Sequence, residues 1–450
     1  MHFRGQEIRL LQSTDMRWWR TTSAALLALL FVLDAYRATT QSIVHDEALS
    51  WQLYLKQPWA RMFSAYDANN HVLFTILAKL SIAVFGVSEW SMRLPSLLAC
   101  VLYFVVIFKL CGDLFGESPW FLAAVALLAM NPLVFDFLLA ARGYGLALAF
   151  FMLALVSRRY GGVAAGLAIA SNLTVLYPVV GLGVFILWKR RTEFWRFLVA
   201  AALIPAAFLA IPLSHASRDS FYVGTKSLFE SFTTLAYHSL MHNTYSSWIG
   251  RHFWTIDAVL AGLAAVTIAA AAFCARRWKD PMLGLVAVVM TTALSLLVAG
   301  HYTVGMPYPI DRTGLYWIPL LELSGALILS RIRGAILFAL PLLAVYAVQL
   351  PTSWYSVWKY DAGTKQAVEA IRERPVREAR VGATWELEPS LNFYRDRYRL
   401  SWVAPVTREG ADGNFDYYFL LPEDHRLVNR RNLRVIFNDQ VSGLVVGTVR

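Results

Sequence analysis

Three ionisable side chains stand together in the stretch SIVHDEALSW, where His45 is followed by Asp46 and Glu47. A carboxylate can take the proton of an attacking hydroxyl, so this acid pair is a candidate for general-base catalysis. The apolar spacing that follows predicts a short helix over 46–57. Acids are also common in the first turn of a helix, because the helix N-terminus carries partial positive charge. Helix capping and catalysis therefore both remain open for this pair.

Two further segments carry charged groups that could act with these acids. FDFLLAARGYG contains Asp136, Arg142 and Tyr144, and YPIDRTGLYW contains Asp311 and Arg312. Arginine binds phosphate through a planar set of donors, which suits a lipid phosphate at a membrane surface. Taken singly, each arginine could instead pair with an acid, as Asp311 and Arg312 could, or extend its charge to the membrane surface. Together the segments predict a site where a charged lipid headgroup meets an aqueous substrate.

Other polar side chains of the 42–92 segment are candidates for substrate binding, namely His45, Lys56, Asn70 and His71. The spacing of the two histidines is not one that ligates a metal, so no metal site is predicted. The sequence lacks the phosphate loops GxxxxGK[ST] and GxGxxG and the catalytic motifs HExxH and GxSxG, and no cofactor is predicted. Four other histidines are interpreted as solvated loop residues: His215, His238, His242 and His301.

The composition is that of a membrane protein with several spans and some aqueous parts. Of the 450 residues, 57% are hydrophobic and 16% are charged, whereas soluble domains are about 25% charged. A net charge of +11 would suggest nucleic-acid binding in a soluble chain. Here the basic residues form short runs between apolar segments, a pattern that indicates membrane topology, so no nucleic-acid partner is predicted.

Apolar runs suited to membrane-spanning helices recur along the first 350 residues. The segment 70–86 is also apolar, but it is short and contains Lys79, which favours a helix lying along the membrane surface. Asp34 and Arg37 lie near the end of the first run, and we expect them to pair or to face the bundle interior. About eleven spans are predicted, at 18–40, 93–111, 119–136, 143–157, 161–173, 175–188, 197–213, 253–274, 281–300, 313–330 and 334–350.

With these spans, the basic clusters all fall on one side of the membrane, as expected for cytoplasmic loops. They are the N-terminus and the runs SRRY, WKRRTEFWR, ARRWKD and SRIRG. The opposite, extracytoplasmic side then receives HDEALSW, the DFLLAARGY turn, a loop over 214–251, the segment GHYTVGMPYPIDRTG and everything beyond 351. The candidate catalytic residues are therefore predicted to lie on the outer face.

After Pro351 the composition becomes that of a soluble domain. TKQAVEAIRERP and PSLNFYRDRYRL predict helices, and ARVGATW, FDYYFLLP, LRVIFND and GLVVGTV predict strands. We therefore predict a membrane module over 1–350 and a small extracytoplasmic α/β domain over 351–450.

These segments resemble the polyprenyl-phosphate-dependent glycosyltransferases of the GT-C superfamily, in particular bacterial enzymes related to protein O-mannosyltransferases and lipid A aminoarabinose transferases. The resemblance rests on HDEALSW, on NNHVLFTILAKLSIAVFGVSEWSMRLPSLL, and on NPLVFDFLLAARGYGLAL and PYPIDRTGLYWIPLLEL. It implies an all-α polytopic fold with two interfacial helices in the first outer loop, at 46–57 and 70–86, and an outer α/β domain. Many relatives have a basic residue or histidine followed by two prolines where this chain reads NNHVL, a departure at Asn70 and His71.

The resemblance implies transfer of a sugar from a polyprenyl-phosphate donor to a glycan, lipid or protein acceptor, with inversion, on the outer face of a bacterial inner membrane. The family's first-loop acid corresponds to Asp46, the expected general base, and Glu47 would orient the acceptor or a neighbouring base. The arginine of its second outer loop corresponds to Arg142, which with Arg312 would offset charge on the departing lipid phosphate.

Two other function classes are alternatives. A transporter or flippase for a lipid-linked saccharide would carry functional charges near the bilayer midplane and often an inverted repeat. The charges here sit at one face, and the sequence shows no repeat. A non-catalytic assembly protein that binds through its outer domain is the other alternative.

Overall fold

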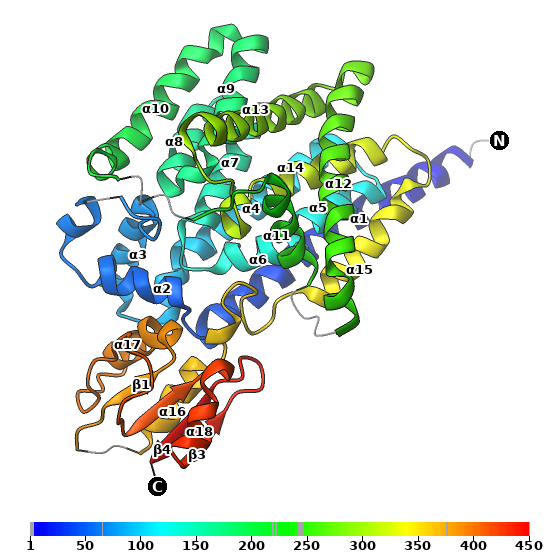
Figure 1. Ribbon diagram of the computed structural model, residues 1–450. Coiled ribbons are helices and arrows are strands. Elements are labelled where there is room, and N and C mark those ends of the chain that lie inside the picture. Colours follow the sequence, from blue (N-terminus) through cyan, green and yellow to red (C-terminus); the bar gives the residue numbers. More distant parts are fainter. Residues whose placement is uncertain are drawn as a thin grey trace.

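The first 350 residues form a bundle of helices, and a small sheet lies at the opposite end of the chain (Figure 1). The computed structural model describes residues 4–64, 66–217, 220, 223–241, 247–374 and 377–449. The helices of the bundle are α1 (Arg4–Thr40), α2 (His45–Ser50), α3 (Val72–Phe85), α4 (Glu89–Phe115), α5 (Pro119–Met130), α6 (Pro132–Leu139), α7 (Gly143–Val156), α8 (Gly161–Ser171), α9 (Leu176–Lys189), α10 (Arg191–Ser214), α11 (Leu228–Leu240), α12 (Ser247–Trp278), α13 (Pro281–Val304), α14 (Trp317–Leu329) and α15 (Ala339–Gln349).

Each apolar segment predicted as a span contains a helix, as do the two segments predicted as interfacial helices. Among the described residues, four helices are long and apolar enough to cross a membrane: Trp18–Thr40 within α1, and α4, α10 and α13. The apolar helices α3, α7, α8, α9, α14 and α15 are shorter than the roughly 20 residues that a straight span needs. The number of about eleven spans therefore stays a prediction.

The segment predicted as one span over 119–136 is two helices, because α5 and α6 meet at a bend of 59°. Pro132 is the first residue of α6 and has no backbone N–H to continue the hydrogen bonds of α5. The side chain of Asn131 accepts hydrogen bonds from the backbone N–H groups of Leu133 and Val134 at 3.1 and 3.2 Å. The bend directs α6 and the following Arg142 toward α2.

The segment 214–251, predicted as a loop, contains the helix α11, so that prediction is wrong. The side chain of Ser227 caps this helix by accepting a hydrogen bond from the Glu230 N–H at 3.3 Å. α11 packs against α6, α12 and α15. It therefore places side chains of this segment on a helix of the bundle, where the sequence pattern predicted a loop.

A buried ionic cluster joins α1 to α6. Arg37 donates to Asp34 at 3.0 Å and to Asp136 at 2.6 Å, and the Arg37 and Asp34 side chains are fully buried. The second carboxylate oxygen of Asp136 accepts from the backbone N–H of Ser356 at 2.9 Å. The predicted pairing of Asp34 with Arg37 is confirmed, and Asp136 is part of this cluster.

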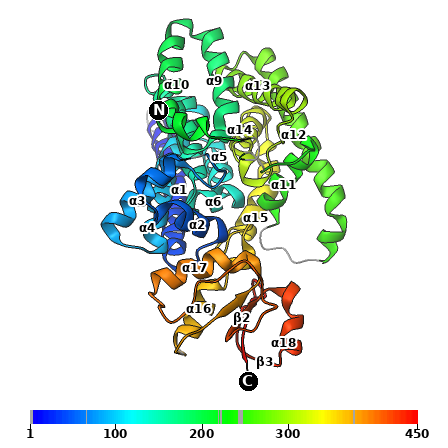
Figure 2. The same ribbon diagram turned by 60° about the vertical axis from the view of Figure 1, so that its left-hand side comes forward.

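The C-terminal region combines the helices α16 (Thr364–Arg372), α17 (Glu388–Arg397) and α18 (Arg426–Arg430) with the strands β1 (Val381–Ala383), β2 (Tyr417–Leu420), β3 (Leu433–Asn438) and β4 (Val445–Val449). Both predicted helices and all four predicted strands are present. The strand order is β1-β2-β4-β3, with β1 and β2 parallel and the other pairs antiparallel. α17 packs against α2 and so joins this region to the bundle (Figure 2).

Candidate active site

The two acids of α2 point to different surroundings. Val44 precedes the helix in an extended conformation, and its backbone N–H donates to the Glu47 carboxylate at 3.2 Å, so Glu47 caps the helix. The Asp46 carboxylate instead lies 3.1 Å from a terminal nitrogen of Arg312 and 3.7 Å from one of Arg142. Of the two alternatives left open by the sequence, helix capping is made by Glu47, and catalysis by Asp46, which faces the arginines, stays a prediction.

Arg142 is held by backbone and side-chain groups of the 42–92 segment. It stands directly before α7, and its side chain is 1% exposed. One terminal nitrogen donates to the Ser50 hydroxyl at 2.9 Å and the other to the Asn69 side chain at 3.1 Å. These contacts hold the guanidinium group beside Asp46. Its N–H groups could also donate hydrogen bonds to a phosphate.

Arg312 reaches Asp46 from a short 3-10 turn, Asp311–Gly314. Asp311 adopts a left-handed conformation with φ of 45°, which is strained for a residue with a side chain. The Asp311 carboxylate lies 3.3 Å from His238 on α11, and the His238 ring also bonds the Ser356 hydroxyl at 2.6 Å. The sequence-based options of an Asp311–Arg312 pair and of a solvated His238 are thus wrong, because each residue pairs across elements.

A cavity of about 610 Å³ opens beside Asp46. Of the residues predicted for the site, it is lined by His45, Asp46, Arg142, Tyr144 and Arg312. Tyr144 also lines a neighbouring, mostly apolar cavity of about 150 Å³, together with His71. The structure therefore brings together groups from three segments that are far apart in the sequence.

The C-terminal region supplies a wall of this cavity that the sequence did not predict. Trp385, Glu388 and Arg408 line it, together with Gln52 of the 42–92 segment. Glu388 accepts from Arg408 at 3.0 Å and from Gln52 at 3.2 Å. No local pattern marks these residues, because their approach to Asp46 depends on the docking of α17 on α2. Asn69 was also missed, although its neighbour Asn70 was predicted.

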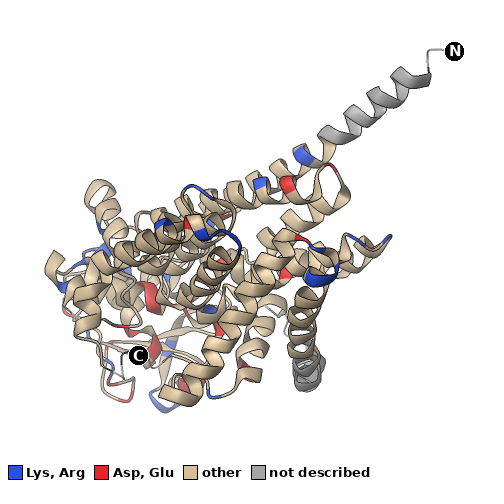
Figure 3. Cartoon of the chain, turned by 90° about the horizontal axis from the view of Figure 1, so that it is seen from above, with Lys and Arg blue, Asp and Glu red and all other residues tan. Residues whose placement is uncertain are grey.

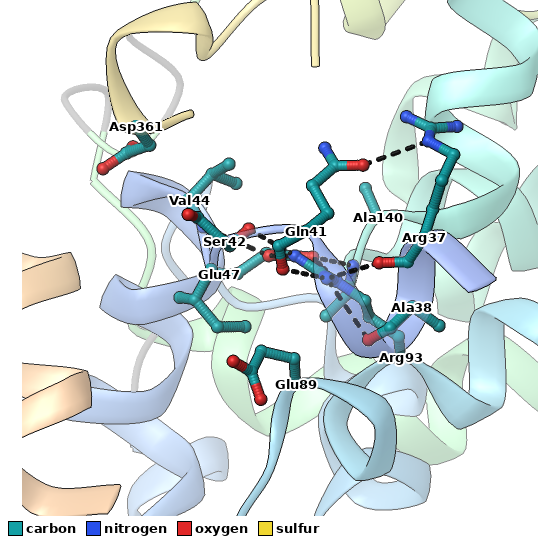
Figure 4. A network of polar contacts seen from close by, with 12 residues as sticks. Arg37, Ala38, Gln41, Ser42, Val44, Glu47, Glu89, Arg93, Ala140 and Asp361 are labelled. Carbon is teal, nitrogen blue, oxygen red and sulfur yellow. Dashed lines mark hydrogen bonds and ion pairs between the residues drawn. The ribbon is translucent and has the colours of Figure 1, made fainter. Parts of the chain in front are cut away.

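Glu47 does not line the cavity and is fully buried. Its carboxylate accepts from Arg93 on α4 at 2.7 and 3.1 Å and from the Ala141 N–H at 2.6 Å. Arg93 also donates to the carbonyls of Gln41 and Ser42, at 2.8 and 2.7 Å, and Figure 4 shows this network. The prediction that Glu47 orients the acceptor does not fit this geometry, because both carboxylate oxygens are occupied within the protein.

Three other predicted residues line neither of these two cavities. Asp136 belongs to the Arg37 cluster. The side chain of Asn70 donates to the Met62 carbonyl at 2.7 Å, and Lys56 lies 3.2 Å from Asp396. Of the further histidines, His242 lies outside the described residues. Among the described residues, no group of three or more His, Cys, Asp and Glu side chains is arranged to hold a metal ion.

The electrostatics of the cavity keep Asp46 ionised. Burial would raise the pKa of the Asp46 carboxyl, but the positive charges of Arg312 and Arg142 outweigh it and hold that pKa below its ordinary value of 3.8. Burial lowers the pKa of His45, which favours a neutral ring. The Nδ1 atom of His45 lies 2.6 Å from the Glu386 carbonyl, which can only accept, so Nδ1 carries the proton.

The pH dependence of activity follows from the low pKa of Asp46. A carboxyl whose pKa is lower in the folded protein than in the unfolded chain stabilises the fold at pH values above the unfolded-state pKa. This stabilisation is lost only as the pH falls through the lower pKa of the folded state. The Asp46 ion pairs should therefore persist between about pH 5 and 8. We expect kcat/KM, which reports groups of the free enzyme, to show no acidic limb from Asp46 in that range. Such a limb, if it persisted in a His45→Gln variant, would contradict the assignment.

Two of three comparisons with known proteins found matches. A family model described as dolichyl-phosphate-mannose-protein mannosyltransferase matches residues 71–215. Among curated protein sequences, no match is found. ArnT from Cupriavidus metallidurans, in its crystal structure bound to undecaprenyl phosphate, is 13% identical, with a TM-score of 0.52, and the match covers 96% of this chain and 98% of that one. The mostly helical fold class predicted from the sequence is confirmed.

Two further structures were found at lower TM-scores. The same enzyme in the apo state is 15% identical over 96% of this chain and 98% of that chain, with a TM-score of 0.42. The Archaeoglobus fulgidus oligosaccharyltransferase, in complex with Zn and sulfate, is 13% identical over 83% of this chain and 61% of that one, with a TM-score of 0.46.

Proposed function

We propose that this multi-pass membrane protein is a glycosyltransferase of the GT-C superfamily, and that it transfers a sugar from a polyprenyl-phosphate donor to an acceptor hydroxyl. The observation that carries this proposal is the cavity in which Asp46 faces two arginines from separate loops. Such a site offers a base for a hydroxyl and cations for a phosphate. That ArnT, which has this fold, was solved with undecaprenyl phosphate supports a polyprenyl-phosphate donor.

The donor phosphate would lie between Arg142 and Arg312. Both guanidinium groups are nearly buried and lie near the same Asp46 oxygen. A phosphate that enters the cavity would compete with Asp46 for these hydrogen-bond donors, which are already in position. The adjoining apolar cavity, which shares Tyr144, would receive the first isoprene units. As the glycosidic bond breaks, the two arginines would stabilise the negative charge that grows on the leaving lipid phosphate.

Asp46 would act as the general base. The acceptor oxygen attacks the anomeric carbon while Asp46 takes the hydroxyl proton. The bond from that carbon to the phosphate oxygen breaks, and the lipid phosphate leaves with the electron pair, with inversion at the anomeric carbon. In the free protein the arginines depress the pKa of Asp46. A donor phosphate that shares them would weaken that effect, and Asp46 would become a stronger base when the donor is bound.

We also propose the arrangement of the chain in its membrane. Residues 1–350 would form the membrane module and residues 351–450 an extracytoplasmic domain, in a bacterial inner membrane with the N-terminus in the cytoplasm. The basic runs between the predicted spans support this orientation, because such runs are expected in cytoplasmic loops. Figure 3 shows the Lys and Arg residues of the described chain in blue, seen from above the view of Figure 1.

Purified protein with a synthetic polyprenyl-phosphate sugar tests the proposal. Transfer of the sugar to a glycan, lipid or protein acceptor, with release of the polyprenyl phosphate, is the expected result. Movement of the intact donor across vesicles, with no bond broken, would instead identify a transporter. Comparing the lipid-linked sugars and surface glycans of wild-type and deletion cells would then identify the sugar and the acceptor.

The Arg312→Gln variant tests the phosphate role. A charge-assisted hydrogen bond contributes about 1.5–3 kcal/mol, so we expect the KM for the donor to rise roughly 10- to 150-fold. Inhibition by free polyprenyl phosphate should weaken by a similar factor. Arg61→Gln is the control, because Arg61 is an exposed arginine of the first outer loop that does not line the cavity. An unchanged donor KM in Arg312→Gln would exclude Arg312 from the phosphate site.

A further inference from the structure

Two cavities lie at the end of the bundle opposite the C-terminal sheet, where α7 meets α8, α9 meets α10 and α12 meets α13 (Figure 1). Their volumes are about 770 and 870 Å³, and both are lined by Arg158 and Arg190. Neither cavity includes a residue of the candidate active site. The packing of α8 against α10 and of α9 against α13 brings these three connections together.

Cations outnumber acids along both cavities. The cations include Arg158, Lys189, Arg190, Arg196, Arg276 and Lys279, and the acids are Glu193 and Asp280. Both acids are already engaged: Glu193 lies 3.6 Å from Arg158 and 4.0 Å from Arg190, and Asp280 pairs with Arg331. Among the described residues, Arg276 and Lys279 have no acidic partner within 4.0 Å. The cavities therefore carry positive charge that the protein does not neutralise.

Arg190 is the best placed of these cations to bind an anion. Its side chain is 26% exposed at the junction of the two cavities, and its only ion pair in the described structure is the long one to Glu193. Burial lowers the pKa of Arg190, and the charge of Arg158 lowers it further. An anion in the cavity would relieve both effects, because Arg190 shares its acidic partner Glu193 with Arg158 and an anion would add counter-charge.

The surface around the cavities suits a lipid rather than a free anion. Trp188 and Trp195 line the two cavities and are 62% and 69% exposed, as is typical of tryptophans at the headgroup level of a membrane. Apolar side chains of the same helices are exposed next to them, including Val184, Leu187 and Val199. A molecule with an anionic head and hydrocarbon chains would match both parts of this surface.

We propose that these cavities bind the phosphate headgroup of an anionic phospholipid, at a site separate from that of the sugar donor. Basic loops are expected on the cytoplasmic side of any membrane protein, but topology requires only charge. Membrane topology does not require that basic side chains line cavities, where they are partly buried and outnumber the acidic side chains. The site would hold a lipid of the surrounding membrane, with its phosphate beside Arg190 and its chains along α9 and α10.

Native mass spectrometry of the full chain tests this proposal with phosphatidylglycerol, phosphatidylcholine and inorganic phosphate as probes. The expected result is a phosphatidylglycerol affinity at least about tenfold above that of phosphatidylcholine. The double variant Arg190→Gln/Arg276→Gln should remove this difference. The control Arg277→Gln/Arg333→Gln should keep it, since it removes the same charge from the same end of the molecule without touching residues that line either cavity.

Three outcomes would overturn the proposal. The first is equal affinity of the wild-type protein for the two phospholipids. The second is an equal loss in the cavity and control variants, which would show a charge effect without a site. The third is binding of inorganic phosphate as tight as that of phosphatidylglycerol, which would identify a free-anion site. If the double variant does not fold, Lys279→Gln replaces it, against Arg277→Gln.

Discussion

The Asp46→Asn variant is expected to transfer sugar about 100- to 10,000-fold more slowly than the wild-type protein, because general-base help of this kind has that magnitude. Asparagine keeps the shape of the side chain but cannot take a proton from the acceptor. It also removes the charge that faces Arg142 and Arg312. Initial rates with a polyprenyl-phosphate sugar, at saturating donor, measure this effect.

Donor binding separates a catalytic role of Asp46 from a purely structural one. In the wild-type protein, Asp46 and the donor phosphate compete for the same two guanidinium groups. Asp46→Asn should therefore bind polyprenyl phosphate as tightly as the wild type, or more tightly, while its turnover falls. Asp396→Asn is the control, since Asp396 lies outside the cavity and pairs with Lys56 at a partly exposed position. A folded Asp46→Asn protein with full activity would refute the base assignment.

Local patterns were sufficient to predict most helices and all four strands, with α11 as an exception. An apolar run that begins at a proline, as in α13, indicates a helix by its local sequence. α11 was missed although the Ser227 side chain caps it, because its sequence is too polar to resemble a span. The break between α5 and α6 was also within reach of the sequence, because Asn-Pro is a turn and cap signal. The break was not predicted because the apolar run continues through it, and hydropathy alone does not indicate a change in the direction of the chain.

The site was predictable in its residue types but not in its pairings. Acids and arginines at the outer ends of predicted spans identified Asp46, Arg142 and Arg312, which the structure brings within 4.0 Å. The partners of Glu47 and Asp311 were missed, because Arg93 and His238 are distant in sequence. Trp385 and Arg408 were missed for a stronger reason. Their place at the cavity depends on how two separately formed regions dock.

The largest expected effect on stability is at the buried pair of Glu47 and Arg93. Both side chains are fully buried, and they share two hydrogen bonds. Removing one partner leaves an uncompensated charge inside the protein, which costs about 3–5 kcal/mol. Arg93→Gln should therefore lower the free energy of unfolding by that amount, measured by equilibrium unfolding in mixed micelles. Arg20→Gln, which breaks an ion pair with an exposed arginine, should cost at most about 1 kcal/mol.

The double variant Glu47→Gln/Arg93→Gln tests whether the loss of stability comes from the interaction between the two residues. With neither charge present, its loss of stability should be smaller than the sum of the two single losses. Additive losses would show that the two residues act independently. Arg93 also donates to the carbonyls of Gln41 and Ser42, which lead into α2. Folded Arg93→Gln protein should therefore also transfer sugar more slowly, because Asp46 is one residue from the Glu47 anchor and depends on it for its position at the cavity.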